Sequence, residues 1–281
     1  LTNEKCSFWH FRFDANSAMK MKAITDYMAD QNQIKKVFLI NQDYSHGQFI
    51  SQAGNALLGE KRPDIEIAGD VLHPVGKVKD FSPYISRIKA SGADTVITGN
   101  WGNDLSLLVK AGDQAGLDVD WYTYYAGGLG TPTSLGKAAA GKVKMITEWQ
   151  ENLAVRYEAL ELRSMLEEFE QRYGGIELYY LRVKTEMDML KKAMEKAGSG
   201  DPQAVAFALE DMSIETPFGT ATMRAADHQL MQPLFMSTFG EDYLEYDSEG
   251  TGFGWKMDAE IPADETRVET SCEMKRPTRA S

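Results

Sequence analysis

Three segments of the sequence place polar and aromatic side chains directly after short apolar runs. They are residues 41–47, 99–101 and 124–127, and they carry the candidate ligand contacts His46, Asn100, Trp101, Tyr124 and Tyr125. If the apolar runs are parallel strands, the three segments meet at the carboxyl edge of one sheet, where open α/β sheets bind ligands. Aromatic walls with a few polar groups are typical of a small-molecule cleft. The alternative, that these aromatics only pack between loops and helices, stays open at this point.

The sequence carries no catalytic or cofactor signature of the usual kinds, neither a nucleophile elbow nor a phosphate loop. Residues 127–130 are rich in glycine but lack the full dinucleotide spacing, so we interpret them as a strand-to-helix turn. The four histidines are not spaced with cysteines or acids as metal ligands are. We therefore expect no metal and no cofactor. His46 with Asp43 is the one pair that a doubly wound enzyme could use, which keeps an enzyme as a remote alternative.

The elements that would position these side chains follow an alternating pattern of strand and helix. Apolar runs lie at residues 37–40, 65–72, 95–98, 121–125 and 143–147, and helix-period segments lie at residues 17–31, 46–59, 81–91 and 103–115. Strands this apolar suit a parallel sheet that is covered on both faces. We predict that residues 11–148 form a doubly wound α/β unit.

The pattern changes after about residue 150. Two amphipathic helical stripes, at residues 162–173 and 179–194, precede a short helix at 202–210 and then several short strands. Amphipathic helices need a surface to cover. Residues 150–235 contain almost no long apolar strand that could supply it.

Composition narrows the range of partners. The net charge is -12 and the sequence pI is about 4.9, so an electrostatic interaction with nucleic acid or anionic lipid is disfavoured. No apolar run approaches the roughly 20 residues of a membrane helix, and we expect no membrane insertion. The two cysteines, Cys6 and Cys272, match no metal or redox spacing. They are either two free thiols or a disulfide that an oxidising compartment would permit.

Residues 37–47, VFLINQDYSHG, resemble the opening of the second lobe of type I periplasmic binding proteins. This family comprises the leucine/isoleucine/valine receptors of ABC importers and their relatives for amides, urea and aromatic acids. Further similar stretches lie in the family's order at residues 76–94, 114–117, 224–229 and 272–277. Together they extend over nearly the whole chain.

The resemblance implies an α/β fold with doubly wound parallel sheets in two lobes, joined by crossover strands. It also implies a periplasmic receptor that clamps a small-molecule ligand by hinge closure and delivers it to an ABC transporter permease. In that compartment we predict the Cys6–Cys272 disulfide. A ligand-sensing or regulatory domain of the same fold is the alternative function.

The resemblance also assigns roles to individual positions. His46 and Trp101 fall on aromatic positions that line the ligand, and Tyr179 falls on a contact from lobe one. Ala126 stands where amino-acid receptors of the family commonly carry an acid for the ligand's ammonium group.

The alanine at position 126 bears on ligand class, because a buried ammonium without a carboxylate is costly. We therefore expect an aromatic or other hydrophobic carboxylate, or secondly an amide, rather than a plain α-amino acid. Asp43 or Asp104 could still supply the missing acid.

By the same resemblance, residues 11–148 and 236–281 make up lobe two, and residues 149–235 make up the C-terminal part of lobe one. The family's N-terminal portion of lobe one has no counterpart in this sequence. We expect a chain that is truncated, cleaved or only partly recorded, with the remaining segment as a candidate partner in the form of a separate piece.

Overall fold

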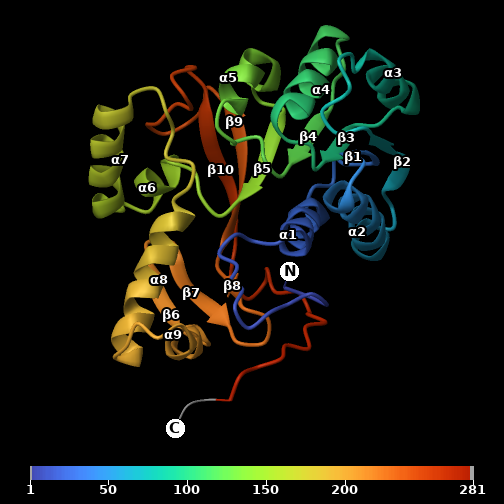
Figure 1. The fold of residues 1–281 in the computed structure, drawn as a ribbon. Coiled ribbons are helices and arrows are strands. Elements are labelled where there is room, and N and C mark those ends of the chain that lie inside the picture. The colour runs from blue at the N-terminus through green and yellow to red at the C-terminus, as the bar shows by residue number, and fades with distance from the viewer. Residues whose placement is uncertain (1, 279–281) are drawn as a thin grey trace.

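The computed structural model describes residues 2–278, which form a seven-stranded sheet flanked by helices and a smaller three-stranded sheet (Figure 1). The helices are α1 (Ser17–Ala29), α2 (Ser45–Lys61), α3 (Ser82–Ser91), α4 (Gly102–Gln114), α5 (Thr131–Leu135), the 3-10 turn η1 (Gly136–Ala139), α6 (Asn152–Arg156), α7 (Leu160–Tyr173), α8 (Arg182–Ala197) and α9 (Pro202–Leu209). The strands are β1 (Lys36–Gln42), β2 (Glu66–His73), β3 (Thr95–Thr98), β4 (Asp120–Thr123), β5 (Val143–Thr147), β6 (Ser213–Thr216), β7 (Gly219–Arg224), β8 (Gln229–Met231), β9 (Leu234–Gly240) and β10 (Gly254–Ile261).

The large sheet has the order β10-β9-β5-β4-β3-β1-β2. Strands β1 to β5 are parallel to one another, which confirms the α/β fold and the five strands expected from the apolar runs. Their carboxyl ends therefore meet at one edge. The antiparallel edge made by β9 and β10 was not predicted.

The predicted helices α1 to α4 are also present, with ends that local chemistry explains. Asn16 caps α1 by accepting hydrogen bonds from the backbone N–H groups of residues 18 and 19. Helix α3 ends at Gly92, whose φ of 69° is in the left-handed region that glycine adopts without cost.

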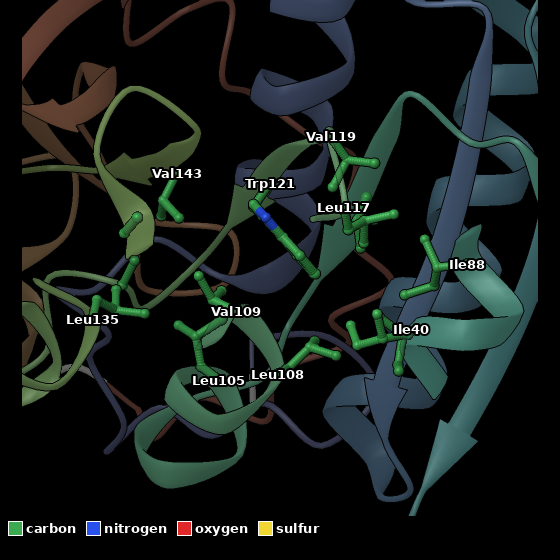
Figure 2. Close-up of a cluster of buried hydrophobic side chains, with 14 of the residues drawn as sticks. Ile40, Ile88, Leu105, Leu108, Val109, Leu117, Val119, Trp121, Leu135 and Val143 are labelled. Atoms are coloured by element: carbon green, nitrogen blue, oxygen red, sulfur yellow. The ribbon is translucent and has the colours of Figure 1, made fainter. Parts of the chain in front are cut away.

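The two faces of the sheet bury separate apolar clusters. Figure 2 shows the first, in which Trp121 lies among Leu105 and Val109 of α4 and Val143 of β5. The next residue of β4, Tyr122, belongs to the second cluster, with side chains of α1 on the opposite face. This alternation is the two-residue period of a strand, and it holds the carboxyl edge between two packed layers.

Helices α8 and α9 pack against a small sheet with the order β6-β7-β8. The sequence analysis did not predict this sheet as a surface for the two helices. One face of α8 packs against this sheet through Met189 and Ala193, whereas Val183 and Met187 remain exposed. The assignment of the two sheets to a complete and an incomplete lobe stays a prediction.

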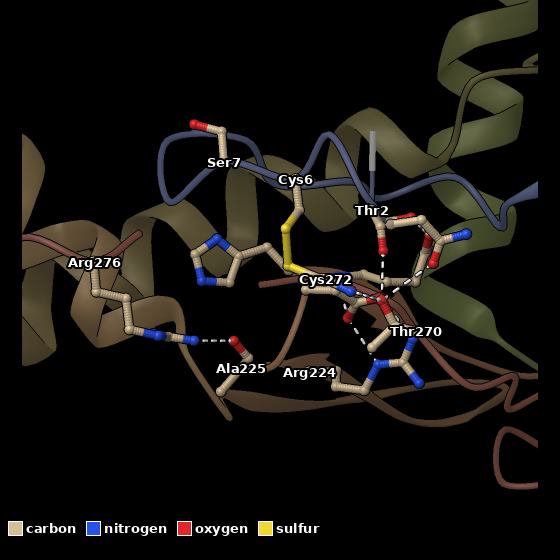
Figure 3. Close-up of a disulfide and its surroundings, with 12 residues drawn as sticks. Thr2, Cys6, Ser7, Arg224, Ala225, Thr270, Cys272 and Arg276 are labelled. Carbon is tan, nitrogen blue, oxygen red and sulfur yellow. Dashed lines mark hydrogen bonds and ion pairs between the residues drawn. A yellow bond between two sulfur atoms is a disulfide. The ribbon is translucent and has the colours of Figure 1, made fainter. Parts of the chain in front are cut away.

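A disulfide joins Cys6 to Cys272, with Cα atoms 5.6 Å apart, and this confirms the predicted pair (Figure 3). Beside it, the Thr270 hydroxyl donates to the carbonyl of Thr2 over 2.8 Å. Segments that lie 266 residues apart in sequence are therefore held together by covalent and polar contacts.

Within residues 2–278, no helix is long and apolar enough to cross a membrane.

We predict that the double variant Cys6→Ser/Cys272→Ser folds but is less stable by roughly 2–5 kcal/mol, because the bridge closes a long loop in the unfolded chain. Urea unfolding, followed by far-UV circular dichroism, measures the difference. Dithiothreitol should destabilise the wild type and leave the double variant unchanged. Equal stability of the two proteins without reductant would contradict the prediction.

Candidate functional site

A cleft of about 500 Å³ opens at the carboxyl edge of the large sheet. Its walls come from the segments after β1, β3 and β4 and from the loop before α8, and its lining residues are Tyr44, Trp101, Gly102, Tyr125, Gly128, Leu129, Thr131, Tyr179 and Tyr180. Five of these nine are aromatic, and none is acidic or basic. Such a surface suits an uncharged or flat apolar group.

Trp101 and Tyr44 form one wall. The indole Nε1 of Trp101 donates a hydrogen bond to the Tyr44 hydroxyl over 3.0 Å, although 48% of the Trp101 surface is exposed. The hydroxyl proton of Tyr44 is not used in that bond, so it remains available to a ligand acceptor.

His46 lies in the first turn of α2, with its ring centre 5.6 Å from that of Tyr125 and 5.5 Å from that of Tyr124. Its Nδ1 is 2.9 Å from the Ser17 hydroxyl, and its Nε2 is buried without a hydrogen-bond partner among the described residues. Burial, aided by the charges of Lys20 and Arg12, lowers the pKa of His46 to about 4, so the ring is neutral near pH 7.

Two glycines allow α2 to approach the strand ends this closely. A Cβ on Gly47 would lie 1.9 Å from the carbonyl oxygen of Gln42, and one on Gly99 would lie 2.1 Å from the Cδ1 of Ile50. Neither position has room for a side chain.

Four charged side chains lie behind the cleft, of which Lys20 and Glu148 are buried and Asp14 and Arg182 are partly buried. The ammonium of Lys20 is 3.2 Å from Asp14 and 3.5 Å from Glu148, and the guanidinium of Arg182 is 3.0 Å from Asp14 and 2.9 Å from Glu148. Burial alone would lower the pKa of Lys20, but the two carboxylates outweigh it and raise that pKa. We call these four residues the charge quartet.

The charge quartet touches both sides of the cleft. The Lys20 ammonium is 5.2 Å from the centre of the Tyr125 ring, and Arg182 is 5.6 Å from the rings of Tyr179 and Tyr180. Lys20 belongs to α1, which packs on the large sheet, and Arg182 begins α8, which packs on the small one. The quartet therefore positions the tyrosines of the two units relative to each other.

Of the residues predicted as ligand contacts, Trp101, Tyr125 and Tyr179 line the cleft, and His46 packs behind Tyr125. Asn100 is fully buried, and its amide contacts Nε2 of His73. Tyr124 and Ala126 are also buried; Tyr124 packs beneath His46, and Ala126 belongs to the apolar cluster of α4. Their roles as ligand contacts stay predictions.

Sequence reasoning missed Tyr44, Tyr180 and the charge quartet. Tyr44 stands in the segment after β1, so the strand-end pattern could have identified it. Tyr180 lies between two helices, and its only signal is its place beside Tyr179. Lys20 carries no such signal, because a lysine in an amphipathic helix is usually solvated.

The two acids considered as ammonium partners do not line the cleft. Asp104 is buried and accepts hydrogen bonds from the side chain of Gln42 at 2.8 Å and from the backbone of Gly76 at 2.7 Å. Asp43 accepts a hydrogen bond from Gln48 over 2.9 Å. In the described part of the chain, no group of three or more His, Cys, Asp or Glu residues is placed to hold a metal ion.

The sequence matches the periplasmic binding protein family over residues 1–242, and the chain belongs to this family. It is 32% identical over 285 aligned residues to the Leu/Ile/Val-binding protein homolog 4 of Brucella abortus, and the alignment covers 99% of this chain and 67% of that protein. The matched family and this relative are named as binding proteins, which agrees with the expectation of a receptor and not an enzyme.

Solved structures agree. The crystal structure of a leucine-, isoleucine-, valine-, threonine- and alanine-binding protein from Brucella ovis, in a closed conformation, superimposes with a TM-score of 0.86 at 30% identity, covering 98% of this chain and 71% of that one. A solute-binding protein from R. palustris in complex with benzoate has a TM-score of 0.77 at 18% identity, with 97% and 71% covered, and shows likeness of fold alone.

We predict that Lys20→Met destabilises the protein by roughly 3–5 kcal/mol, because it leaves the buried Glu148 and the partly buried Asp14 with a single cation, Arg182. Chemical denaturation measures this loss. Lys36→Met is the matched control, since Lys36 pairs with Glu66 at an exposed site, and it should cost less than about 1 kcal/mol. Similar losses in the two variants would show that the quartet has no special role.

We also predict a pH-dependent contribution from His46. Its folded pKa is lowered to about 4, so between pH 6.5 and pH 4 the unfolded chain binds a proton that the folded protein does not. The free energy of unfolding should therefore decrease as the pH is lowered through this window, and His46 should account for roughly 2 kcal/mol of the decrease. Chemical denaturation of the wild type and of His46→Gln at pH 7 and pH 4.5 measures the contribution of His46. Between these two pH values the variant should lose less stability than the wild type. Equal losses would rule it out.

Proposed function

We propose that the protein is a periplasmic receptor that captures an aromatic or other hydrophobic carboxylate in its aromatic cleft and delivers it to the permease of an ABC importer. Membership of the periplasmic binding protein family supports the transport role and the compartment. The observation that carries the ligand class is the cleft lining, which has five aromatic side chains and no carboxylate.

The physical case for this ligand class rests on complementarity. The rings of Trp101, Tyr125 and Tyr179 offer apolar faces for a flat body. Hydroxyl groups of Tyr44 and Thr131 can donate hydrogen bonds to a carboxylate. An α-ammonium group would find no acid in the lining and would lose hydration without compensation.

The fold is compatible with such a ligand. The R. palustris protein crystallised with benzoate shares the fold of this chain. At 18% identity it supports only that a protein of this fold can bind an aromatic carboxylate.

A branched-chain amino acid is the second candidate. It is favoured by the names of the two most similar proteins described above, a Leu/Ile/Val-binding homolog and a leucine-, isoleucine-, valine-, threonine- and alanine-binding protein. An acceptor for its ammonium group would then have to come from outside the present lining.

We predict that benzoate or 4-hydroxybenzoate stabilises the protein in a thermal-shift screen, and that leucine and valine at equal concentration do not. A ligand present at 100 times its Kd adds about 2.7 kcal/mol to the folded state, which gives a rise of several degrees. Isothermal titration calorimetry then measures affinity. Benzamide in the same screen tests the amide alternative.

The variant Trp101→Ala should weaken the binding of the aromatic acid roughly tenfold or more, because it removes one wall of the cleft. Trp9→Ala is the matched control, since Trp9 is also exposed and does not line the cleft. Selective, tight binding of leucine or valine would overturn the proposed ligand class and leave the receptor role intact.

A further inference from the structure

A second cavity, of about 440 Å³, lies between α7, the loop that follows it and residues 245–250. It shares no lining residue with the aromatic cleft. Seven of its lining residues are acidic and none is a lysine, arginine or histidine; the acids are Glu151, Glu167, Glu170, Glu177, Glu245, Asp247 and Glu249. An excess of one sign of charge around a concave site focuses a negative potential into it.

Glu177 is the residue that this arrangement leaves unsatisfied. Only 8% of its surface is exposed, and its Oε2 is buried with no hydrogen-bond partner in the described chain. Burial, and then the nearby charge of Glu151, raise the pKa of Glu177 well above its usual range, although a hydrogen bond with the Ser248 side chain opposes the rise. A buried carboxyl oxygen without a partner is costly, so its presence on a cavity wall calls for an explanation.

Glu151 is the second carboxyl at the same place. One of its oxygens accepts a hydrogen bond from the backbone N–H of Leu178 over 2.8 Å, and the residue is partly buried. Burial raises the pKa of Glu151 to about 7, with smaller contributions from the charges of Glu170 and Asp247. Two neighbouring carboxyls therefore lie in a cavity whose lining includes no lysine, arginine or histidine.

The other acids of the cavity are largely committed to structural roles. Glu249 accepts hydrogen bonds from the backbone of Gly130 and Thr133, and Asp247 accepts one from Gly252. Glu245 pairs with Arg163. Glu170 accepts a hydrogen bond from the backbone of Gly175, and Glu167 is exposed to solvent. The buried carboxyl oxygen that lacks a partner is therefore on Glu177, with Glu151 beside it.

The remaining walls indicate what kind of cation fits. Leu166, Phe169, Ile176 and Tyr246 supply apolar surface beside the carboxyls. No trio of acids in residues 2–278 has metal-ligand geometry, and the volume exceeds what a bare ion fills. An ammonium group on an aliphatic body matches both the charge and the walls.

We propose that this cavity binds an aliphatic amine, with one ammonium group on Glu151 and Glu177, the alkyl chain along Phe169 and Ile176, and any second ammonium group at the acidic rim. An ammonium group beside Glu177 favours the ionised form of that carboxyl, so binding releases protons into the solvent. The site shares no lining residue with the aromatic cleft.

Titration calorimetry of the protein with 1,5-diaminopentane at pH 7.5 tests the proposal. We expect saturable binding, and a measured enthalpy that differs between phosphate and Tris because the buffer takes up the released protons. The neutral analogue 1,5-pentanediol should not bind. Glu177→Gln should lower the affinity for the diamine roughly tenfold or more, whereas Glu60→Gln, a change of the same charge on the exposed side of α2, should leave it unchanged.

Trp101→Ala should bind the diamine as the wild type does, which separates this site from the cleft. Glu177→Gln removes a buried unpaired carboxyl, so it should fold at least as stably as the wild type; Glu151→Gln provides a second test of the same site. Failure of the diamine to bind, stabilisation by calcium chloride alone, or undiminished affinity in both glutamine variants would each overturn the proposal.

Discussion

The charge quartet is the interaction on which the cleft depends. Burying a charged group costs several kcal/mol, and here each cation of the quartet lies 2.9–3.5 Å from two carboxylates that offset this cost. Asp14 precedes α1, Lys20 lies within it, Glu148 follows β5 and Arg182 opens α8. Any displacement of one of these elements would separate a cation from its carboxylate. The two units of the molecule therefore have a sharply defined relative position where the tyrosines of the cleft are attached.

The parallel sheet sets a second constraint. Because its carboxyl ends meet at one edge, three segments far apart in the sequence contribute to one cleft. Gly47 and Gly99 remove the side chains that would otherwise hold α2 away from that edge. The site thus arises from topology together with close backbone packing, and its aromatic character is added by residues such as Tyr44 and Trp101.

Much of the fold was predictable, because buried parallel strands are continuously apolar and amphipathic helices have a clear period. The antiparallel strand β10 was not predicted, because it lies at the edge of the sheet and has no continuous apolar run. The site was predictable only in outline. Tyr124 and Tyr125 are neighbours in the same segment, yet Tyr125 lines the cleft and Tyr124 is buried beneath it. The pairing of Lys20 with Glu148 depends on tertiary contacts between residues 128 positions apart, which no local pattern encodes.

The disulfide has a consequence that reaches beyond its energy. In covalent terms the bond between Cys6 and Cys272 turns the intervening backbone into a closed ring. A ring can be opened at any one peptide bond and still remain a single molecule. A protease that cuts one exposed loop, such as the segment around Gly250, would therefore give two polypeptides that the disulfide still joins. No fragment would be released. The fold could survive that first cut, and only a second cut or the loss of the sulfur bridge would let a piece diffuse away.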